Sequence, residues 1–430
     1  MTRRRLVVEE IARVEGEGAL DLEIEAGQVT VARLRIFEPP RLFEALLRGR
    51  DLREAPDIAA RICGICPVAY QLGAAQAMER ALGLCIEPSV RALRRLLYCG
   101  EWIESHALHV VLLHAPDFLG YPDAMQMARD HRAAVDAGLA LKRFGNDVLR
   151  TLGGREVHPV NVRVGGFHRW PRADELDPLA ARAAGARAQA VELLRWAARF
   201  DFPAIERDYA FVAMRDAQRY PLNEGRIVSS GGLDIDLDDF DRHFVEHQVP
   251  HSTALHAALR GHGPYLVGPL ARYALNFDRL PAEVQALARE AGLGPVCRNP
   301  FRSILVRLLE VVYACGEVER LVADLRRAPA PLAPALTLRA GVGQGCTEAP
   351  RGLCHHRYAI DATGAITSAR IVPPTSQNQA SIEADLRELA SRHLDASDED
   401  LSALCERAIR NHDPCISCST HFLRLTVRGR

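Results

Sequence analysis

The chain has 430 residues, 48% of them hydrophobic, and a formal net charge of −1 at pH 7. This length and hydrophobic fraction allow a large buried core, and the near-neutral charge gives no electrostatic case for nucleic acid or an anionic membrane as a partner. No stretch approaches the roughly 18 uninterrupted apolar residues of a membrane helix, and the basic N-terminus lacks the apolar run of a signal peptide. We therefore expect neither nucleic-acid binding nor direct membrane insertion.

The N-terminal segment predicts a β-hairpin over residues 5–37. Leu20, Leu22 and Ile24 alternate with acidic residues, and Ala26-Gly27 supplies a turn before a second alternating stretch. Glu15 precedes this hairpin, so we expect it at a strand end or turn that points inward.

Helical periodicity dominates the middle of the chain. Pro67 opens a helical stretch that runs to about Leu82, and Pro88 starts a long helix through His114 that Pro116 is expected to stop. Further helices are expected at 123–152, 174–200, 282–291, 301–327, 378–394 and 398–410. Residues 201–250 are irregular and indicate loops and short strands, whereas residues 357–361 and 366–372 predict a second hairpin.

The predicted fold is predominantly helical, of the α+β class, with a large helical core and small peripheral hairpins or sheets. We expect one domain over residues 1–430, with a helical core at 67–330 and a C-terminal α+β part at 335–421.

Two C-x-x-C pairs are the main chemical feature: Cys63 with Cys66, and Cys415 with Cys418. Four sulfur donors suit zinc, copper(I), an iron–sulfur cluster, or nickel with iron. A zinc ribbon usually keeps its pairs within about 20 residues, but roughly 350 residues separate these two. The whole fold would therefore have to assemble the site, which leaves structural zinc as one alternative among the four.

The remaining cysteines and glycines give weaker signals. Seven single cysteines are expected to be small buried hydrophobes, and reduced thiols fit a cytosolic compartment: Cys85, Cys99, Cys297, Cys315, Cys346, Cys354 and Cys405. Gly341, Gly343 and Gly345 do not have the G-x-G-x-x-G spacing of a dinucleotide site, and no predicted strand precedes them. We expect neither a nucleotide site nor, outside the two C-x-x-C pairs, a further cysteine cluster for an iron–sulfur centre on this chain.

The residues flanking the two pairs, R-x-C-G-x-C and D-P-C-x-x-C-x-x-H, resemble the metal-binding signatures of nickel–iron hydrogenase large subunits. Further segments match this family in order, at 11–16, 43–50, 104–109, 116–117, 153–159, 267–272 and 348–352. Segments 11–18 and 104–121 look most like the cytoplasmic, NAD(P)-linked branch, the sulfhydrogenase alpha subunits. The resemblance implies the large-subunit fold and reversible heterolytic cleavage of H2.

The resemblance also implies a ligand set. Cys63 and Cys415 would be terminal on nickel, and Cys66 and Cys418 would bridge nickel to iron, which carries cyanide and carbon monoxide in the family. With the flanking motifs included, the structural zinc alternative is disfavoured.

Heterolytic cleavage needs a hydride acceptor and a base close together, and the proton must then leave through groups of matched acidity. A nickel-bound thiolate, that of Cys415, is a plausible base, and by family position Glu15 is the candidate proton relay. Arg351, beside Pro350, matches the family arginine above the open metal position. A buried guanidinium needs carboxylate partners, for which we expect Asp117 and Asp413.

A second metal site is implied near the C-terminus. Glu44 and His421 match residues around an oxygen-rich site, usually magnesium, that is completed by waters. Family members are trimmed after this histidine, so residues 422–430 are expected to be a cleaved tail. His106, His109 and His158 are expected to be structural, although the family places His106 near the metal core.

The resulting functional hypothesis is the catalytic subunit of a cytoplasmic nickel–iron hydrogenase coupled to NAD(P). The implied partners are an iron–sulfur small subunit, flavin and NAD(P)-binding subunits, a maturation endopeptidase and nickel-insertion proteins. The alternative is a cysteine-retaining structural or quinone-docking subunit of a complex-I-like assembly.

Overall fold

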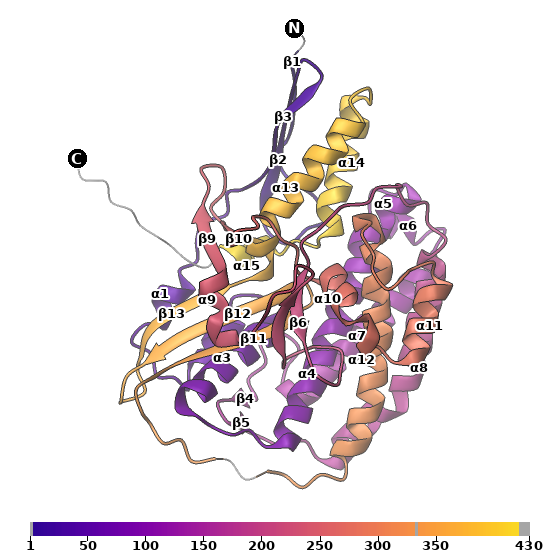
Figure 1. Cartoon of the computed structure of the whole chain (residues 1–430). Coiled ribbons are helices and arrows are strands. Elements are labelled where there is room, and N and C mark those ends of the chain that lie inside the picture. Colours follow the sequence, from indigo (N-terminus) through magenta and orange to yellow (C-terminus); the bar gives the residue numbers. More distant parts are fainter. Residues whose placement is uncertain (1–2, 332–333, 421–430) are drawn as a thin grey trace, which may run out of the picture.

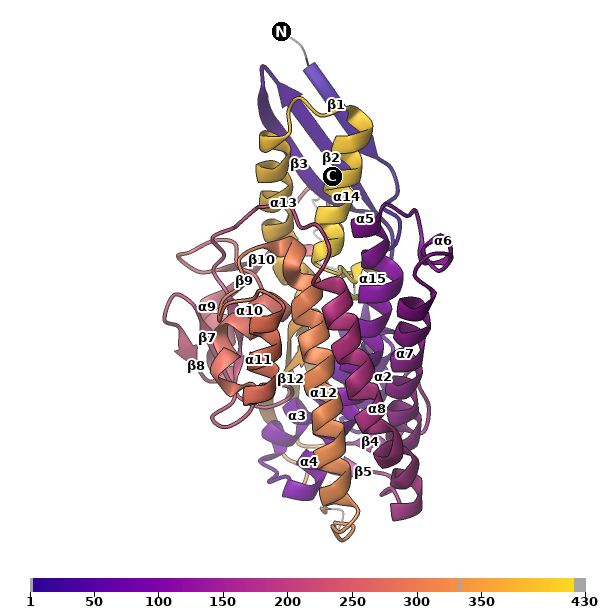
Figure 2. The same ribbon diagram turned by 90° about the vertical axis from the view of Figure 1, so that its right-hand side faces the viewer.

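Four long helices form the body of the computed structural model, which describes residues 3–331 and 334–420. They are α4 (Pro88–Ala107), α7 (Arg132–Gly153), α8 (Ala173–Ala197) and α12 (Ser303–Leu325). Each packs against two of the others, α4 on α7 and α12, and α8 on the same two. Figures 1 and 2 show them running side by side along the long axis of the molecule. Buried apolar side chains of these helices make up a large part of the largest core cluster.

Shorter helices surround this bundle. They are α1 (Phe43–Leu47), α2 (Ala55–Ala60), α3 (Pro67–Leu82), α5 (Ala115–Leu119), α6 (Ala124–Met127), α9 (Phe240–His243), α10 (Pro269–Asn276), α11 (Ala282–Glu290), α13 (Pro374–Arg392), α14 (Asp398–Asn411) and α15 (Ile416–Ser419). Three 3₁₀ turns, η2 (Leu237–Asp239), η3 (Phe277–Arg279) and η4 (Pro300–Arg302), and one π-helix, η1 (Leu108–His114), complete the set. No helix within residues 3–331 or 334–420 combines the length and apolar character that crossing a membrane requires.

The sheets are small, antiparallel and peripheral. Their orders are β1 (Arg3–Val8)–β2 (Gly18–Glu25)–β3 (Gln28–Ile36), β6 (Val212–Arg215)–β7 (Arg226–Ser229)–β8 (Asp234–Ile235), β11 (Gly341–Ala349)–β12 (Gly352–Ile360)–β13 (Ile366–Val372), β4 (Val162–Arg163)–β5 (Gly166–Phe167) and β9 (Phe244–Gln248)–β10 (Leu255–Leu259). The first sheet projects from one end of the bundle and packs its buried face with α13 and α14 in a second core cluster (Figure 1). The predicted fold class is confirmed: the chain is mostly helical with small antiparallel sheets.

Most predicted elements are present, with three differences. The predicted hairpins are β2–β3 and β12–β13, but β1 and β11 add a third strand to each. The predicted 123–152 helix is divided into α6 and α7. Pro116 does not stop the long helix: η1 leads into α5, and Pro116 lies in the first turn of α5, where a missing N–H costs little.

Helix α3 packs directly on β11 because three glycines leave room for it. Gly341, Gly343 and Gly345 alternate along the strand and therefore share one face. A Cβ atom at Gly343 would lie 1.9 Å from the Ala77 carbonyl oxygen, and one at Gly345 would lie 2.2 Å from that of Gly73. The glycine run that fails as a nucleotide motif is thus a packing surface for the helix that follows Cys66.

Candidate metal centre

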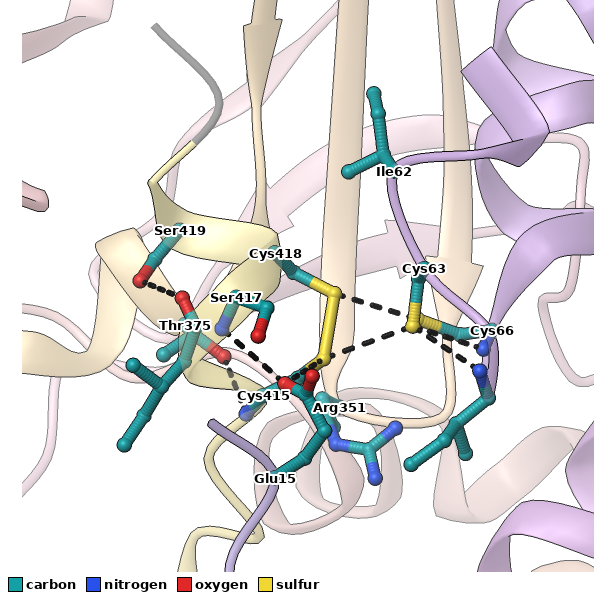
Figure 3. Close-up of a disulfide and its surroundings, with 12 residues drawn as sticks. Glu15, Ile62, Cys63, Cys66, Arg351, Thr375, Cys415, Ser417, Cys418 and Ser419 are labelled. Carbon is teal, nitrogen blue, oxygen red and sulfur yellow. Dashed lines mark hydrogen bonds between the residues drawn. A yellow bond between two sulfur atoms is a disulfide. The ribbon is translucent and has the colours of Figure 1, made fainter. Parts of the chain in front are cut away.

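The four cysteines of the C-x-x-C pairs converge in one buried place. The Cys63 Sγ atom lies 2.9 Å from that of Cys66 and 3.6 Å from that of Cys415, and Cys66 and Cys418 are 3.9 Å apart. All four sulfur atoms lie within 4.8 Å of one another. Figure 3 shows the first pair arriving from the loop before α3 and the second from the loop and short helix α15.

The sulfur atoms of Cys415 and Cys418 are joined as a disulfide in this structure, which the sequence analysis did not expect. A disulfide and a pair of metal-bound thiolates are alternative states of the same C-x-x-C pair, because a metal ligand must be a free thiolate. Four cysteines with mutually close sulfur atoms, all buried, are a donor set that fits soft or borderline metals, including nickel and iron. The residues present therefore fit the centre that the sequence pattern implies.

The pKa values of Cys63 and Cys66 are shifted in opposite directions. Burial alone would raise the pKa of the Cys63 thiol, but a hydrogen bond from Cys66 and the charge of Arg351 lower it below the ordinary value. The same hydrogen bond, followed by burial, raises the pKa of Cys66 well above the ordinary value. Cysteine ligands bind a metal as thiolates, so metal binding must displace the protons that these two thiols carry.

The first pair is held at the start of α3. Cys66 is the N-cap residue of this helix. The buried carboxylate of Glu101, on α4, accepts the first-turn amides of Val68 at 2.6 Å and Ala69 at 3.1 Å. These bonds satisfy amides that a helix start leaves unpaired. Glu101 was missed in the sequence because its partners lie in another helix.

Glu15 contacts the second pair directly. Its Oε2 atom accepts a hydrogen bond from the Ser417 amide at 3.1 Å and lies 3.0 Å from Cys415 Sγ, within reach of a hydrogen bond from the Cys415 thiol once the disulfide is reduced. Its backbone carbonyl accepts the Ile416 amide at 2.9 Å, so Glu15 and Cys415 form a parallel β-bridge. The expectation of a turn residue that points inward is confirmed, and its role as a proton relay remains a prediction.

Gly16 permits this close approach. Its φ of +87° lies in the left-handed region, and a Cβ atom there would lie 2.7 Å from the Ile416 Cβ atom and 2.9 Å from the Ser417 amide nitrogen. The glycine of the R-x-E-G element is needed because the C-terminal loop packs against its backbone.

Arg351 lies at the turn between β11 and β12, beside the cysteines (Figure 3). Its Nε atom donates to the Asp413 carbonyl at 2.8 Å, and its terminal nitrogens donate to Asp413 Oδ1 at 3.0 Å and Ser105 Oγ at 3.3 Å. Burial would lower the pKa of Arg351, but Asp413 and the cysteine sulfurs raise it further above its ordinary value, so the side chain stays charged. The predicted pairing with Asp413 is confirmed.

The predicted pairing of Asp117 with Arg351 is wrong. Asp117 instead accepts two hydrogen bonds from Arg410, at 2.7 and 2.9 Å, and one from Arg13. Arg13 belongs to the R-x-E-G element and Arg410 to the end of α14, so Asp117 ties the segment carrying Glu15 to the segment leading to Cys415. Pro350 is buried next to Arg351, and its carbonyl accepts a hydrogen bond from Arg272 at 2.9 Å.

Arg41 was not among the predicted site residues, yet it bridges the two cysteine loops. One terminal nitrogen donates to the Ile62 carbonyl at 2.6 Å and also to the Ser417 carbonyl. Ile62 precedes Cys63, and Ser417 precedes Cys418. The backbone amide of Arg41 also donates to the Thr420 carbonyl at 2.7 Å. A lone arginine in an arginine-rich chain gave no signal for this role.

The second predicted metal site is only partly described. Glu44 lies in α1, and its Oε1 atom accepts the Ile371 amide at 2.7 Å. Arg41, just before α1, bonds to Thr420, so this helix lies next to the end of the described chain. His421 and residues 422–430 lie outside the described residues.

His106, in the last turn of α4, and His109, in η1, are buried and neutral. Burial lowers the pKa of His106 to about 4, against the opposing effect of Glu310, whose Oε2 atom is 2.9 Å from Nε2. Burial also lowers the pKa of His109 well below the ordinary value, and His109 Nε2 lies 2.9 Å from the Arg410 carbonyl. These contacts agree with the expected structural roles. His158, which was also expected to be structural, is partly exposed.

All seven single cysteines are free, and six of them are buried as expected. The prediction of burial is wrong for Cys85, which is exposed because it lies in the connection between α3 and α4.

Comparisons with known proteins identify similar chains. The family model described as nickel-dependent hydrogenase matches residues 41–147. Sulfhydrogenase 2 subunit alpha of Pyrococcus furiosus is 35% identical over 97% of this chain and 99% of its own length. Sulfhydrogenase 1 subunit alpha of the same organism is 33% identical, covering 98% of each chain. A solved structure of an NAD+-reducing NiFe hydrogenase in the H2-reduced state superposes with a TM-score of 0.89 at 30% identity, covering 97% of this chain and 99% of the other.

Proposed function

Since the chain belongs to the nickel–iron hydrogenase family as a catalytic large subunit, we propose that it works in a cytoplasmic complex in which partner subunits couple reversible H2 oxidation to NAD(P). The single observation that carries the chemistry is the convergence of Cys63, Cys66, Cys415 and Cys418 within 4.8 Å. The NAD(P) coupling is supported by the likeness to a solved NAD+-reducing NiFe hydrogenase.

These four cysteines would hold the nickel–iron centre, with Cys63 and Cys415 terminal on nickel and Cys66 and Cys418 shared with iron. When bound, the centre supplies the open coordination position and the electron acceptor at which H2 is cleaved. Cyanide and carbon monoxide on the iron belong to the same proposal. Magnesium would bind near Glu44 and His421.

The protein's own residues supply proton handling and orientation. Cys415 Sγ lies 3.0 Å from Glu15 Oε2, so a proton taken up by the free thiolate of Cys415 can pass directly to this carboxylate. Arg351 is charged and fixed by Asp413 and Ser105, so it presents a permanent positive field to the sulfur atoms. Asp117 acts through Arg13 and Arg410, which position the two ends of the site.

Electrons must leave to a partner subunit. Among the described residues, the cysteines outside the two pairs do not gather into a second cluster that could hold an iron–sulfur centre. We therefore propose an iron–sulfur small subunit as the direct electron partner, with flavin and NAD(P) sites on further subunits. Maturation would involve nickel-insertion proteins and an endopeptidase.

The test is metal analysis and infrared spectroscopy of native protein. About one nickel and one iron per chain, with bands from diatomic iron ligands, are expected. Zinc as the only transition metal in the four-cysteine site of active material would overturn the assignment. The isolated chain should not reduce NAD(P)+ with H2, whereas the complex should. A complex that contains nickel but has no hydrogenase activity would favour the structural, quinone-docking alternative.

A further inference from the structure

A second group of metal-binding side chains lies away from the four cysteines. His251, His256 and Glu383 each offer a ligand atom, and these atoms lie within 4.8 Å of one another. His251 is in the loop between β9 and β10, His256 is in β10, and Glu383 is in α13. Strand β10 packs against α13, which brings the three residues together (Figure 1).

Hydrogen bonds hold the carboxylate of Glu383 in place within this group. The Nε2 atom of His251 lies 2.7 Å from Glu383 Oε1. The same carboxylate oxygen accepts the Leu34 amide at 3.1 Å, which orients it from β3. Such hydrogen bonds to a ligating group are typical of metal sites.

His256 provides an independent observation. It is only 3% exposed, yet its Nε2 atom is buried and has no hydrogen-bond partner among the described residues. Burying a polar nitrogen without a partner costs about 1–3 kcal/mol. Burial lowers the pKa of His256 to about 4, so the ring is neutral and can donate a lone pair to a metal.

We propose that His251, His256 and Glu383 bind one divalent transition-metal ion of the class of Zn2+ or Fe2+, at a site separate from the four cysteines. Two imidazoles and one carboxylate are the protein ligands of many zinc sites that keep a water ligand, and also of mononuclear iron(II) sites. The side chains of His251 and Glu383 are 16% and 18% exposed, which leaves access for the ion and for water.

The bound ion would join the β9–β10 hairpin to α13. The loop that carries His251 is already attached to β3, because the Thr253 amide donates to the Ile36 carbonyl at 2.8 Å. The N-terminal end of α13 contacts the four-cysteine site, because Thr375 Oγ1 accepts the Cys415 amide at 3.0 Å. The site would therefore stabilise the helix that supports the second cysteine pair.

The test uses nickel-matured complex, in which the four cysteines already hold metal. It is incubated with Zn2+, or anaerobically with Fe2+, and then dialysed, and metal per chain is measured. Wild-type protein should retain one additional ion, and Glu383→Gln and His256→Gln should not. His262→Gln is the matched control, since His262 is exposed in the turn after β10. The ion retained in the larger amount identifies the metal.

Affinity and stability provide a second readout. The dissociation constant for the added metal ion should rise by at least about 10-fold in Glu383→Gln. Added metal should raise the unfolding temperature of wild type and His262→Gln but not of Glu383→Gln. The partly exposed Glu383 keeps the test valid if His256→Gln fails to fold. Equal metal content in all variants, or no additional ion in wild type, would overturn the proposal.

Discussion

At the scale of single residues, the catalytic centre depends on side chains that touch both ends of the chain. Glu15 binds the Cys415 loop through its carboxylate and its backbone. Arg351 holds Asp413, whose φ of +51° lies in the left-handed region. Non-glycine residues rarely adopt this conformation unless surrounding contacts hold them there.

Replacing Glu15 by Gln should stop proton transfer without affecting the binding of nickel. The amide oxygen can still accept the Ser417 amide, so nickel content should not change, but an amide does not titrate. We expect H/D exchange with D2 to fall by roughly 10²–10⁴-fold. Glu17→Gln, at an exposed position two residues later, is the control. An unchanged exchange rate in Glu15→Gln would mean that the proton leaves by another group.

Replacing Arg41 by Met should loosen the two cysteine loops from each other. Methionine keeps much of the side-chain volume but cannot donate to the Ile62 and Ser417 carbonyls. Each lost partner is expected to cost about 1–3 kcal/mol. Nickel should be lost faster to a chelator, and the unfolding temperature should fall. Arg48→Met, an exposed substitution in the same segment, should match wild type. If the two variants retain nickel equally, Arg41 does not position the site.

Glu104 should give the protein a specific pH dependence. Burial raises its pKa from 4.5 to about 7, against the opposing effects of Lys142 and Arg351. The folded state therefore binds more protons than the unfolded state between these values, and stability from this group is lost as pH rises through about 7. Glu104→Gln, uncharged at every pH, should gain stability relative to wild type, by up to about 3 kcal/mol above pH 8.

Denaturant unfolding of wild type and Glu104→Gln at pH 5, 6, 7 and 8 tests this prediction. Glu87→Gln, at the exposed start of α4, controls for the loss of a carboxylate. A stability difference between Glu104→Gln and wild type that does not change with pH would contradict it.

At the scale of elements, the site is built where helix starts meet hairpin turns. Cys66 begins α3, Cys415 precedes α15, and Arg351 lies at the β11–β12 turn. The contact of α3 with β11 sets the first cysteine pair against Arg351. Ile416 packs in the core of the N-terminal sheet, while its neighbour Cys415 belongs to the core of the helical bundle. The second pair thus lies where these two cores meet.

Gly343→Ala should disrupt the α3–β11 contact. The new methyl group would overlap the Ala77 carbonyl, so the helix must move, at an expected cost of at least about 1–3 kcal/mol. Unfolding temperature and nickel content should both fall. Gly185→Ala, in α8 with nothing within 4 Å of its Cβ position, should instead stabilise by about 0.5–1 kcal/mol. Equal stability of the two variants would mean that α3 does not need the glycine face.

At the scale of the whole molecule, closing the site requires the last residues of the chain to dock on the first hundred. Glu15, Gly16 and Arg41 contact residues 415–420, so the C-terminal loop completes a site that earlier segments have already formed. Once the four sulfur atoms bind the metals, the cysteine ligands themselves block further entry of metal to the site.

We therefore predict that residues 422–430 are removed only after nickel insertion. The loop that carries Cys415 and Cys418 must open to admit the metals, and cleavage after metal insertion would make its docked position permanent. Mass spectrometry of active enzyme should show a chain that ends at His421. Nickel-starved cells should accumulate the form that ends at Arg430. Active enzyme that retains the tail would contradict both the cleavage and the role assigned to His421.

The sequence by itself determined most helices and the four cysteines that form the candidate metal centre. Helix ends depend on local signals, such as Pro67 and Pro88, and apolar periodicity is readable in one segment. The cysteine pairs carry their flanking motifs with them, so they could be recognised without knowing where the chain folds.

Only the tertiary structure decided the partners. Asp117 binds Arg13 and Arg410 rather than Arg351, and Arg41 bridges loops that lie hundreds of positions apart. Residues such as His256 and Glu383 meet only because β10 packs on α13. Neither local propensity nor spacing encodes such pairings, because contact between distant segments is set by how whole elements pack.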